Sequence, residues 1–370
     1  MTYVIYFLSI VIIITLLTLA FFKLKQPFWS RQPVFHLYNL SYWFLSSGII
    51  QRENVSTNSR FYDNSIFHNK VSSKNEGNKQ KIVSFIKDNF VSINEDGVEY
   101  FPTLHNIFSY LGSNSIIGIK YKEPNTKTDI IGCITGRQLF CYLDNKEQFF
   151  INYVDYLCVH KEERNIGIAP KLIYSYYYHQ RENTGNQICL FKKEGELTSI
   201  IPICNYYSYG LFIKDYNPPK MISVVKIVNT QIIYNNITLL KKKFDCIIIP
   251  PVNDFIAMND VHMYGIVNLH KIYCIFFFRN TYTKINGIDV IECFASINNT
   301  DINTFYHSFI GCIMKNFNNK FLIIEDISDN GILIKYIVKC FNIKFKSNTG
   351  YYFYNYAMRP KLPNKTFIIN

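Results

Sequence analysis

Charge is scarce in this sequence, and neither cysteine nor histidine occurs in a recognisable ligand pair. Only 18% of the 370 residues are charged, whereas 48% are hydrophobic and 17% are aromatic. The ten cysteines lie singly, without a CxxC pair, and the eight histidines show no HxxxH or HExxH spacing. These absences argue against a disulfide framework and against a metal centre. We therefore predict a globular chain with reduced, buried cysteines and no metal site.

The positive net charge leaves the kind of anionic partner open. Lys and Arg outnumber Asp and Glu by 39 to 27, which gives a formal net charge of +12. Such a surface suits a phosphate-bearing ligand, an acidic lipid surface or a nucleic acid. The length suits one large domain or two ordinary ones, with ample apolar surface for a core.

The longest uncharged stretch lies at the N-terminus, between Met1 and Phe22. As a helix it would extend roughly 33 Å, enough to cross a hydrocarbon core of about 30 Å. No basic residue precedes it and no small-residue cleavage site follows it, which disfavours a cleaved signal peptide. A buried core helix is the alternative, but every face of the segment is apolar. Since Lys23 and Lys25 follow, the sequence predicts a transmembrane anchor over residues 1–24, with membrane contact through residues 1–22. The protein would be single-pass, with its body facing the cytosol.

The remaining sequence alternates between strand and helix patterns, which predicts a mixed α/β fold. A polar stretch over residues 51–81 is predicted to be a long loop. An Asn286-Gly287 pair between apolar runs predicts a hairpin. Predicted strands cover residues 115–120, 130–135, 138–143, 149–159, 244–249, 272–278, 289–297, 321–324 and 351–356, and predicted helices cover 170–180 and 301–316. Two halves of similar content suggest a duplicated unit, although no residue-level repeat is visible.

A strand, a turn of small residues and a helix follow one another between residues 149 and 181. The strand ends at Val159, the turn covers residues 164–169, and the helix is predicted to begin at Pro170. Backbone N–H groups at a helix N-terminus bind phosphate oxygens, and small residues let the ligand approach closely. Proline suits the first helical turn because it has no N–H to leave unpaired. The segment is a candidate pyrophosphate site, although on this short pattern alone an ordinary strand-to-helix turn is the stronger alternative.

Four stretches match motifs of one known family, in that family's order. Residues 156–161 (Tyr-Leu-Cys-Val-His-Lys), with Ala169-Pro170 after them, are similar to Asn-Phe-Leu-Cys-Val-His-Lys followed by Ala/Thr-Pro. Residues 28–34 (Phe-Trp-Ser-Arg-Gln-Pro-Val) resemble Phe-Trp-x-Thr-Gln-Pro-Val. Residues 217–222 (Asn-Pro-Pro-Lys-Met-Ile) resemble the end of the family's first half, and residues 351–356 (Tyr-Tyr-Phe-Tyr-Asn-Tyr) resemble Tyr-Tyr-Leu-Tyr-Asn-Trp. The chain thus resembles the N-myristoyltransferases over nearly everything that follows its N-terminal segment.

The resemblance implies two tandem acetyltransferase-like halves that share one saddle-shaped mixed sheet. Residues 25–225 would form the acyl-CoA-binding half, and residues 226–370 the peptide-binding half. The implied reaction transfers a long-chain acyl group, expected to be myristoyl, from acyl-CoA to the N-terminal glycine amine of a protein. Acyl-CoA would be a co-substrate and no permanent cofactor would be bound. No nucleic acid partner is expected.

The resemblance also implies roles for individual residues. The backbone N–H groups of Tyr156 and Leu157 would form an oxyanion hole, and Asn370 would supply the base through its α-carboxylate. Trp29 would pack against acyl-CoA, although a tryptophan beside a membrane segment is also typical of an interfacial anchor. The implied acyl-CoA-binding residues are Phe28, Trp29, Tyr156, Leu157, Cys158, Val159, Arg164, Asn165, Ile166, Gly167, Ile168, Ala169 and Pro170.

Three stretches depart from the family pattern, all on the side where an acceptor would bind. Asp155 stands where the family has Asn, residues 191–195 (Phe-Lys-Lys-Glu-Gly) replace a Tyr-Thr-Ala-Gly segment, and residues 347–350 (Ser-Asn-Thr-Gly) replace Gly-Asp-Gly. Binding of acyl-CoA is therefore a firmer expectation than recognition of an N-terminal glycine. The alternatives are an acyltransferase with another acyl group or acceptor, and a non-catalytic membrane-bound structural or interaction protein that keeps the fold.

Overall fold

The computed structural model describes residues 2–71, 76–91, 97–112, 114–125, 127–144, 148–195, 199–213, 220–268 and 271–370. Its strands are β1 (Gly48–Ile49), β2 (Ile66–Lys70), β3 (Val98–Tyr100), β4 (Ile116–Glu123), β5 (Thr128–Leu143), β6 (Phe149–Val159), β7 (Cys189–Glu194), β8 (Cys204–Phe212), β9 (Val225–Ile227), β10 (Cys246–Ile249), β11 (Val261–Asn268), β12 (Lys271–Ile285), β13 (Ile288–Asn298), β14 (Phe321–Glu325), β15 (Ile343–Tyr354), β16 (Tyr356–Ala357) and β17 (Thr366–Ile368).

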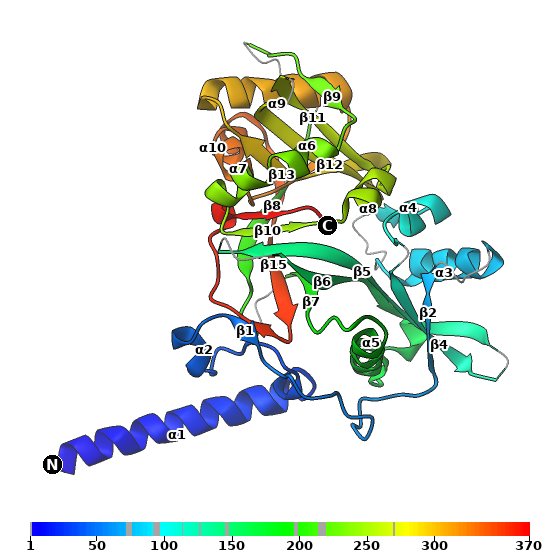
Figure 1. Ribbon diagram of the computed structural model, residues 1–370, viewed down its shortest axis with the longest axis vertical. Coiled ribbons are helices and arrows are strands. Elements are labelled where there is room, and N and C mark those ends of the chain that lie inside the picture. Colours follow the sequence, from blue (N-terminus) through cyan, green and yellow to red (C-terminus); the bar gives the residue numbers. More distant parts are fainter. Residues whose placement is uncertain are drawn as a thin grey trace.

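One mixed sheet of 15 strands runs through the described part of the chain (Figure 1). Its main path follows the order β17-β10-β5-β6-β7-β15-β8-β14-β13-β12-β11-β9, while β2 and β4 extend it beside β5 and β3 pairs with β12. Parallel pairs, such as β6 with β7 and β13 with β14, alternate with antiparallel ones. The prediction of a mixed α/β fold is therefore confirmed.

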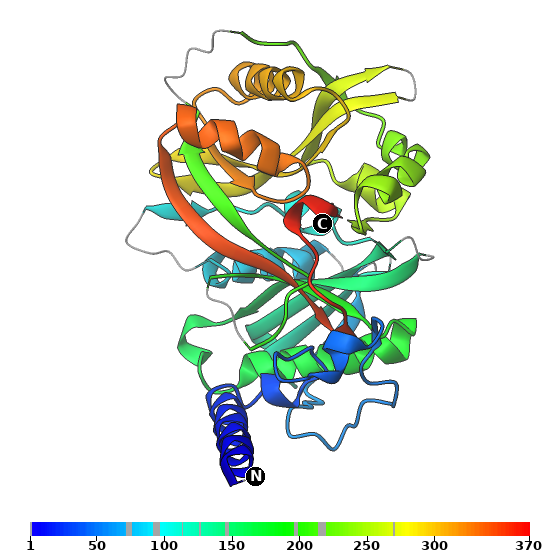
Figure 2. The same cartoon turned by 90° about the vertical axis from the view of Figure 1, so that its left-hand side faces the viewer.

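Helices cover the faces of this sheet at both ends of the molecule. In Figures 1 and 2, α9 and α10 pack on the strands β11 to β14, whereas α3, α4 and α5 lie around β4 to β6. The helices are α1 (Thr2–Lys25), α2 (Ser41–Phe44), α3 (Glu76–Asn89), α4 (Leu104–Ser109), α5 (Ile168–Thr184), α6 (Gln231–Asn235), α7 (Ile237–Lys243), α8 (Val252–Ala257), α9 (Ile302–Asn316) and α10 (Asn330–Cys340), with 3-10 turns η1 (Trp29–Arg31), η3 (Lys161–Glu163) and η4 (Pro363–Lys365).

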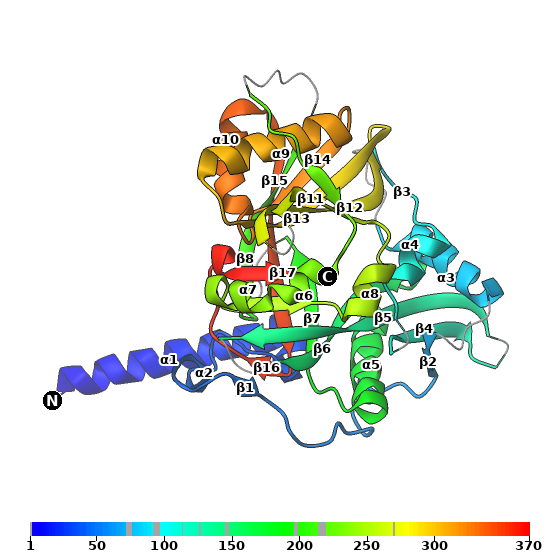
Figure 3. The same ribbon diagram turned by 45° about the horizontal axis from the view of Figure 1, so that its top comes forward.

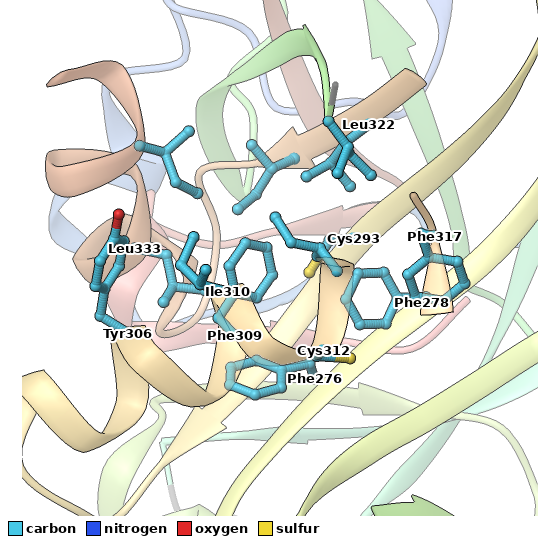
Figure 4. Packing of buried hydrophobic residues seen from close by; sticks show 14 of the residues in the cluster. Phe276, Phe278, Cys293, Tyr306, Phe309, Ile310, Cys312, Phe317, Leu322 and Leu333 are labelled. Atoms are coloured by element: carbon cyan, nitrogen blue, oxygen red, sulfur yellow. The ribbon is translucent and has the colours of Figure 1, made fainter. Parts of the chain in front are cut away.

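The helix α9 illustrates how the local sequence leads to packing. Asp301 caps its first turn by accepting a hydrogen bond from the Thr304 N–H at 2.9 Å, which satisfies one of the free N–H groups of a helix start. The apolar side of α9 then packs on β12, where the rings of Phe309 and Phe276 lie 5.3 Å apart (Figure 4). This helix closes a core that also includes Phe278 and residues of β13, β14 and α10. The prediction of a helix over residues 301–316 is confirmed.

The last residues of the chain return to the middle of the molecule. β15 lies between β7 and β8, and β17 then pairs in parallel with β10, with Phe367 opposite Ile247. Phe367 is fully buried, and its ring stacks on Phe244 at 5.3 Å. In Figure 2 the C-terminus accordingly lies between the upper and lower groups of helices. The fold therefore delivers Asn370 to the centre of the sheet.

The helix α1 corrects the prediction of a membrane anchor. It projects away from the rest of the chain (Figure 3), and its side chains are described without interruption from Ser9 to Lys25. Among the side chains that the structure describes, no helix is long and apolar enough to span a membrane. The predicted anchor over residues 1–24, the membrane contact through residues 1–22 and the single-pass location are therefore wrong.

Two other predictions of local structure need correction. The polar stretch 51–81 includes β2 and the start of α3, whose apolar side, with Ile82 and Ile86 one turn apart, follows the stretch and is buried. The two strands predicted on either side of Gly136 are one strand, since Gly136 pairs with both Ile116 and Val154 and makes no turn. Of the stretch 217–222, residues 217–219 lie outside the described residues.

Candidate active site

A cavity of about 880 Å³ lies where β5, β6 and β7 face β12 and β13. Four residues that were predicted from the sequence line it, namely Trp29, Tyr156, Leu157 and Asn370. These residues come from η1, from the middle of β6 and from the end of the chain, so the fold brings together segments that are far apart in the sequence. The volume is that of a small-molecule site.

The strand β6 bulges at the two predicted oxyanion residues. Its antiparallel register with β5 shifts between Cys133 and Thr135, so that Tyr156 and Leu157 together face Ile134. Tyr156 has a φ of 46°, in the left-handed region. A bulge leaves one residue out of the regular ladder of hydrogen bonds. It is therefore a place where a main-chain N–H can turn from the sheet toward a ligand.

Asp155 already uses one of these donors. The Tyr156 N–H donates a hydrogen bond to Asp155 Oδ1 at 2.9 Å. A negative charge at this position opposes the negative charge that develops on an oxyanion. The departure from the family pattern at residue 155 therefore lies next to the donor that the family pattern implied.

Aromatic side chains form one wall of the cavity. The Trp29 ring stacks on Phe191 at 5.5 Å, and Phe191 stacks in turn on Tyr352 at 5.4 Å. Phe28 is buried behind this wall and contacts Trp29 and Phe61 edge-on, both at 5.0 Å. Trp29 thus faces the cavity, as expected for a ligand contact and not for an interfacial anchor, and Phe28 supports it from outside the cavity.

The candidate pyrophosphate turn lies at the N-terminus of α5. Gly167 has a φ of 87°, a conformation that a residue with a Cβ rarely adopts, and a Cβ placed there would meet no atom within 4 Å. Ile166 is 65% exposed, so the helix start is uncovered. Pro170 is the third helical residue and not the first, but its nitrogen still falls among those without an intrahelical acceptor. The helix start is thus accessible at the turn, and the anion site predicted at residues 165–169 stays a prediction.

Arg164 holds this turn in place. Its Nε donates to the Val159 carbonyl at 3.2 Å, and its Nη2 donates to the Asn89 carbonyl at 2.8 Å. The guanidinium thus ties the turn to the end of β6 and to α3. The turn does not line the cavity itself; α5 connects the two, since Ile173 and Tyr176 of that helix do line it.

The side chains of Cys158 and Val159 are core residues. Cys158 packs in a cluster with residues of α3 and β4, and Val159 packs with residues of α5. Burial raises the pKa of the Cys158 thiol to about 12. The thiol is therefore protonated near neutral pH and is no nucleophile.

A buried network of charges forms the base of the cavity. Lys192 on β7 pairs with Glu325 on β14 and lies 3.5 Å from Glu292 on β13. Arg279 on β12 donates from Nε to Glu292 Oε2 at 2.6 Å. Two cations thus meet two carboxylates from four different strands. Such a network is unusual in a sheet core, because burying charges is costly unless they are paired.

Ionisation in this network follows burial and pairing. Burial raises the pKa of Glu325 to about 7, although Lys192 opposes the rise. Burial also acts against the charge on Glu292, but Arg279 and Lys192 outweigh it and hold the pKa of Glu292 well below its ordinary value. For Lys192, burial is outweighed by Glu325 and Glu292, which raise its pKa. We therefore describe Glu292 and Lys192 as charged, with Glu325 titrating near neutral pH.

Asn370 is held against this network. Only 2% of Asn370 is exposed, and its main-chain oxygen accepts a hydrogen bond from Arg279 Nη1 at 2.9 Å. Its side-chain Oδ1 accepts a hydrogen bond from the Tyr351 hydroxyl at 3.1 Å. The residue before it continues the pairing with β10, since the Ile369 N–H donates to the Ile248 carbonyl at 2.8 Å. The main-chain oxygen of Asn370 is thus fixed inside the cavity.

Sequence reasoning assigned no role to Lys192, Arg279, Glu292 or Glu325. A signal was present at Glu292, which interrupts the apolar run Val290-Ile291-Glu292-Cys293-Phe294, whereas the other three follow the end of an apolar run, as in Phe276-Phe277-Phe278-Arg279. A charge inside a strand that is otherwise apolar points either to a paired, buried group or to a functional site. Arg279 and Glu292 lie opposite each other in the hairpin predicted at Asn286-Gly287, so this pair follows from that prediction once the register is known. The pairing of Lys192 with Glu325 could not be read from the sequence, because β7 and β14 are distant in the chain.

Solved structures share this fold. No protein-family model matches the chain, and no curated protein matches it in sequence. A crystal structure of Saccharomyces cerevisiae N-myristoyltransferase with bound myristoyl-CoA superposes with a TM-score of 0.71 at 14% identity, covering 92% of this chain and 90% of that one. A second such structure gives a TM-score of 0.72 at 14% identity over 91% and 94% of the two chains, and a third, with inhibitors also bound, gives 0.71 at 15% identity over 93% and 94%. The chain has the fold of the N-myristoyltransferases and is strongly diverged from them in sequence.

Proposed function

We propose that this protein is an acyltransferase that moves a long-chain acyl group, myristoyl in the first instance, from acyl-CoA to the N-terminal glycine amine of a protein. The observation that supports this most directly is the bulge at Tyr156 and Leu157, which faces a cavity of about 880 Å³. The fold shared with enzymes solved with bound myristoyl-CoA adds support.

The donor would lie along α5. Its pyrophosphate would meet the main-chain N–H groups of residues 165–169, and its acyl chain would extend past Trp29 into the cavity. Burying thirteen chain carbons at about 0.8 kcal/mol each would contribute roughly 10 kcal/mol, enough to select a long chain. The proposed division has the acyl-CoA-binding half in residues 25–225 and the acceptor-binding half in residues 226–370.

The acceptor amine would attack the carbonyl carbon of the thioester. A C–N bond forms, the C–S bond breaks, CoA leaves as the thiol, and the amine loses one proton. The N–H groups of Tyr156 and Leu157 would hold the oxyanion, and the main-chain carboxylate of Asn370 would take the proton. Since Arg279 donates to the Asn370 oxygen, it favours the charged carboxylate and lowers its basicity. Positioning would therefore contribute much of the rate.

The two tryptophans of the chain allow a direct binding test. Trp43→Phe leaves Trp29 as the single indole, in the wall of the cavity, and myristoyl-CoA should quench its fluorescence. Trp29→Phe is the matched control, since Trp43 packs on Phe35 away from the cavity and should not respond. Equal responses from both variants would contradict the proposed acyl path.

Transfer is then measured as release of the CoA thiol. Release should require both myristoyl-CoA and a peptide with a free N-terminal glycine, and should stop when that amine is acetylated. An enzyme that used another acceptor would release thiol with other amines only. Binding of myristoyl-CoA without release for any acceptor would refute catalysis and favour a non-catalytic binding protein. The hydrogen bond from the Tyr156 N–H to Asp155 favours the non-catalytic binding protein, because it occupies a donor of the proposed oxyanion hole.

A further inference from the structure

Arg137 is a buried cation without a partner. It lies in the middle of β5, only 2% of it is exposed, and it lines the cavity. Its Nε and Nη1 atoms are enclosed by protein and form no hydrogen bond with any described residue. An ionised group in this situation costs stability. Its presence therefore needs an explanation other than the packing of the sheet.

The surroundings of Arg137 keep the guanidinium in position without neutralising it. The Tyr110 and Tyr153 rings lie 4.7 Å and 5.2 Å from its central carbon. Such stacking orients a guanidinium and leaves its N–H groups free to donate. The Oδ1 atom of Asn106, another residue that lines the cavity, is also buried without a partner.

Arg137 differs from the other cations in the described lining of the cavity because it has no carboxylate partner. Its cations are Arg137, Lys192 and Arg279. Lys192 is paired with Glu325 and Arg279 with Glu292. Arg137 is thus the one of these three cations that forms no ion pair with a described residue.

The other carboxylates near Arg137 are engaged or distant. Asp155 accepts the Tyr156 N–H, and Glu194 lies 4.0 Å from Lys192. Arg137 lowers the pKa of Asp254, which burial raises, without forming an ion pair with it. The Asn370 main-chain oxygen, in turn, is bound by Arg279. Since none of these groups forms an ion pair with Arg137, a bound ligand is the partner that we consider.

We propose that Arg137 binds an acidic side chain of the acyl acceptor, so that the substrates of this protein carry Asp or Glu close to the reacting amine. This rests on the proposed function and names its substrate class. Arg137 lies opposite Tyr153, three residues before Tyr156 on β6, which corresponds to about 10 Å along the strand. An extended acceptor covers that distance in about three residues. The acid should therefore be at the third or fourth position.

The test compares peptides that begin with Gly and carry either Asp or Asn at positions two to five. Their binding to the full chain is measured by calorimetry in the presence of a non-reactive thioether analogue of myristoyl-CoA. Wild type should bind the best Asp peptide about tenfold or more tightly than its Asn counterpart, as expected for a charge-assisted hydrogen bond. In Arg137→Gln that ratio should fall below about twofold, and Arg137→Lys should restore part of it.

Arg359→Gln is the matched control, since Arg359 is exposed and does not line this cavity; it should keep the wild-type ratio. The acidic peptide should also raise the melting temperature of wild type and not that of Arg137→Gln. Each shift is measured against the same protein without peptide, so a difference in stability between the two proteins does not affect the comparison.

Three results would overturn the proposal: no preference for Asp in wild type, an unchanged preference in Arg137→Gln, or weaker binding of the acyl-CoA analogue with an intact peptide preference. The third result would mean that Arg137 binds an anionic group of acyl-CoA and not of the acceptor. Because binding is measured without turnover, a failure of thiol release would count against the proposed function alone.

Discussion

Replacing Asp155 by Asn should raise the rate of acyl transfer. Asp155 Oδ1 lies 2.9 Å from the Tyr156 nitrogen, and an oxyanion that shared this single N–H would lie about as far from the nitrogen. The two negative oxygens would be about 4–5 Å apart, which corresponds to about 3–4 kcal/mol of repulsion at an effective dielectric constant near 20. Because the cavity is open to water, we take about 1–2 kcal/mol of this repulsion as effective. The expected gain in kcat is therefore about tenfold.

The substitution isolates the charge, because an Asn Oδ1 can still accept the Tyr156 N–H. Asp155→Ala removes the acceptor as well and should free the N–H for the substrate, so its gain should equal or exceed that of Asn. Asp144→Asn, which removes an exposed carboxylate paired with Lys361, serves as the control for net charge. Rates are measured as thiol release at saturating myristoyl-CoA and peptide. A tenfold loss in Asp155→Asn would refute the reasoning, because it would make Asp155 a needed base.

Three further predictions concern the turn, the chain end and the buried charges. Gly167→Ala should weaken acyl-CoA binding, because Ala disfavours the φ of 87° by about 1–2 kcal/mol; fluorescence titration in the Trp43→Phe background measures this loss, and unchanged affinity would mean that the turn is only structural. Deleting Asn370 alone, since Phe367 is a core residue, should keep acyl-CoA binding and lower kcat at least 100-fold; a normal rate would exclude the Asn370 carboxylate as the base. Because burial raises the pKa of Glu325 to about 7, its protonated form stabilises the fold, and this contribution should be lost between about pH 4.5 and 7.5, up to about 3 kcal/mol. The free energy of unfolding, measured with denaturant, should be lower at pH 8 than at pH 5.5 in wild type, and this difference should be absent in Glu325→Gln. An equal difference in both proteins would contradict the raised pKa of Glu325.

Local patterns predicted those elements whose residues determine their own structure. The strand over residues 149–159 is a run of aromatic and β-branched residues, and β6 has those bounds. The Asn286-Gly287 turn joins β12 to β13, with Ile285 opposite Ile288. The helix α3 was missed although four of its buried residues, Ile82, Val83, Phe85 and Ile86, have helical spacing. Only its polar first residues, 76–81, fall in the stretch that was predicted to be a loop, and the helix packs its apolar side against β4 and β6.

Some residues of the candidate site could likewise be predicted from local sequence, and others could not. The bulge residues Tyr156 and Leu157 and the turn at Gly167 belong to one continuous stretch, so a motif could indicate them. The ion pairs of Lys192 and Arg279 join β7 to β14 and β12 to β13. The second pair lies within one hairpin. The first depends on the strand order of the whole sheet, which no local segment determines.

The placement of charge bears on whether this protein has kept an activity. One wall of the cavity is aromatic, formed by Trp29 and its neighbours, and suits an acyl chain, whereas the base carries Arg137 and the network around Lys192. Replacing a buried ion pair by well-packed apolar residues is often neutral or stabilising by about 1–4 kcal/mol, so stability alone gives no reason to keep these charges. A protein that used the fold only as a structural module would gain by losing Arg137, whose charge nothing in the described fold matches. The proposed acidic acceptor gives a reason to keep Arg137. A carboxylate of a ligand binds strongly to a desolvated cation that the protein already holds in position. The peptide-binding comparison of wild type with Arg137→Gln therefore also separates a binding site that is in use from a remnant of one.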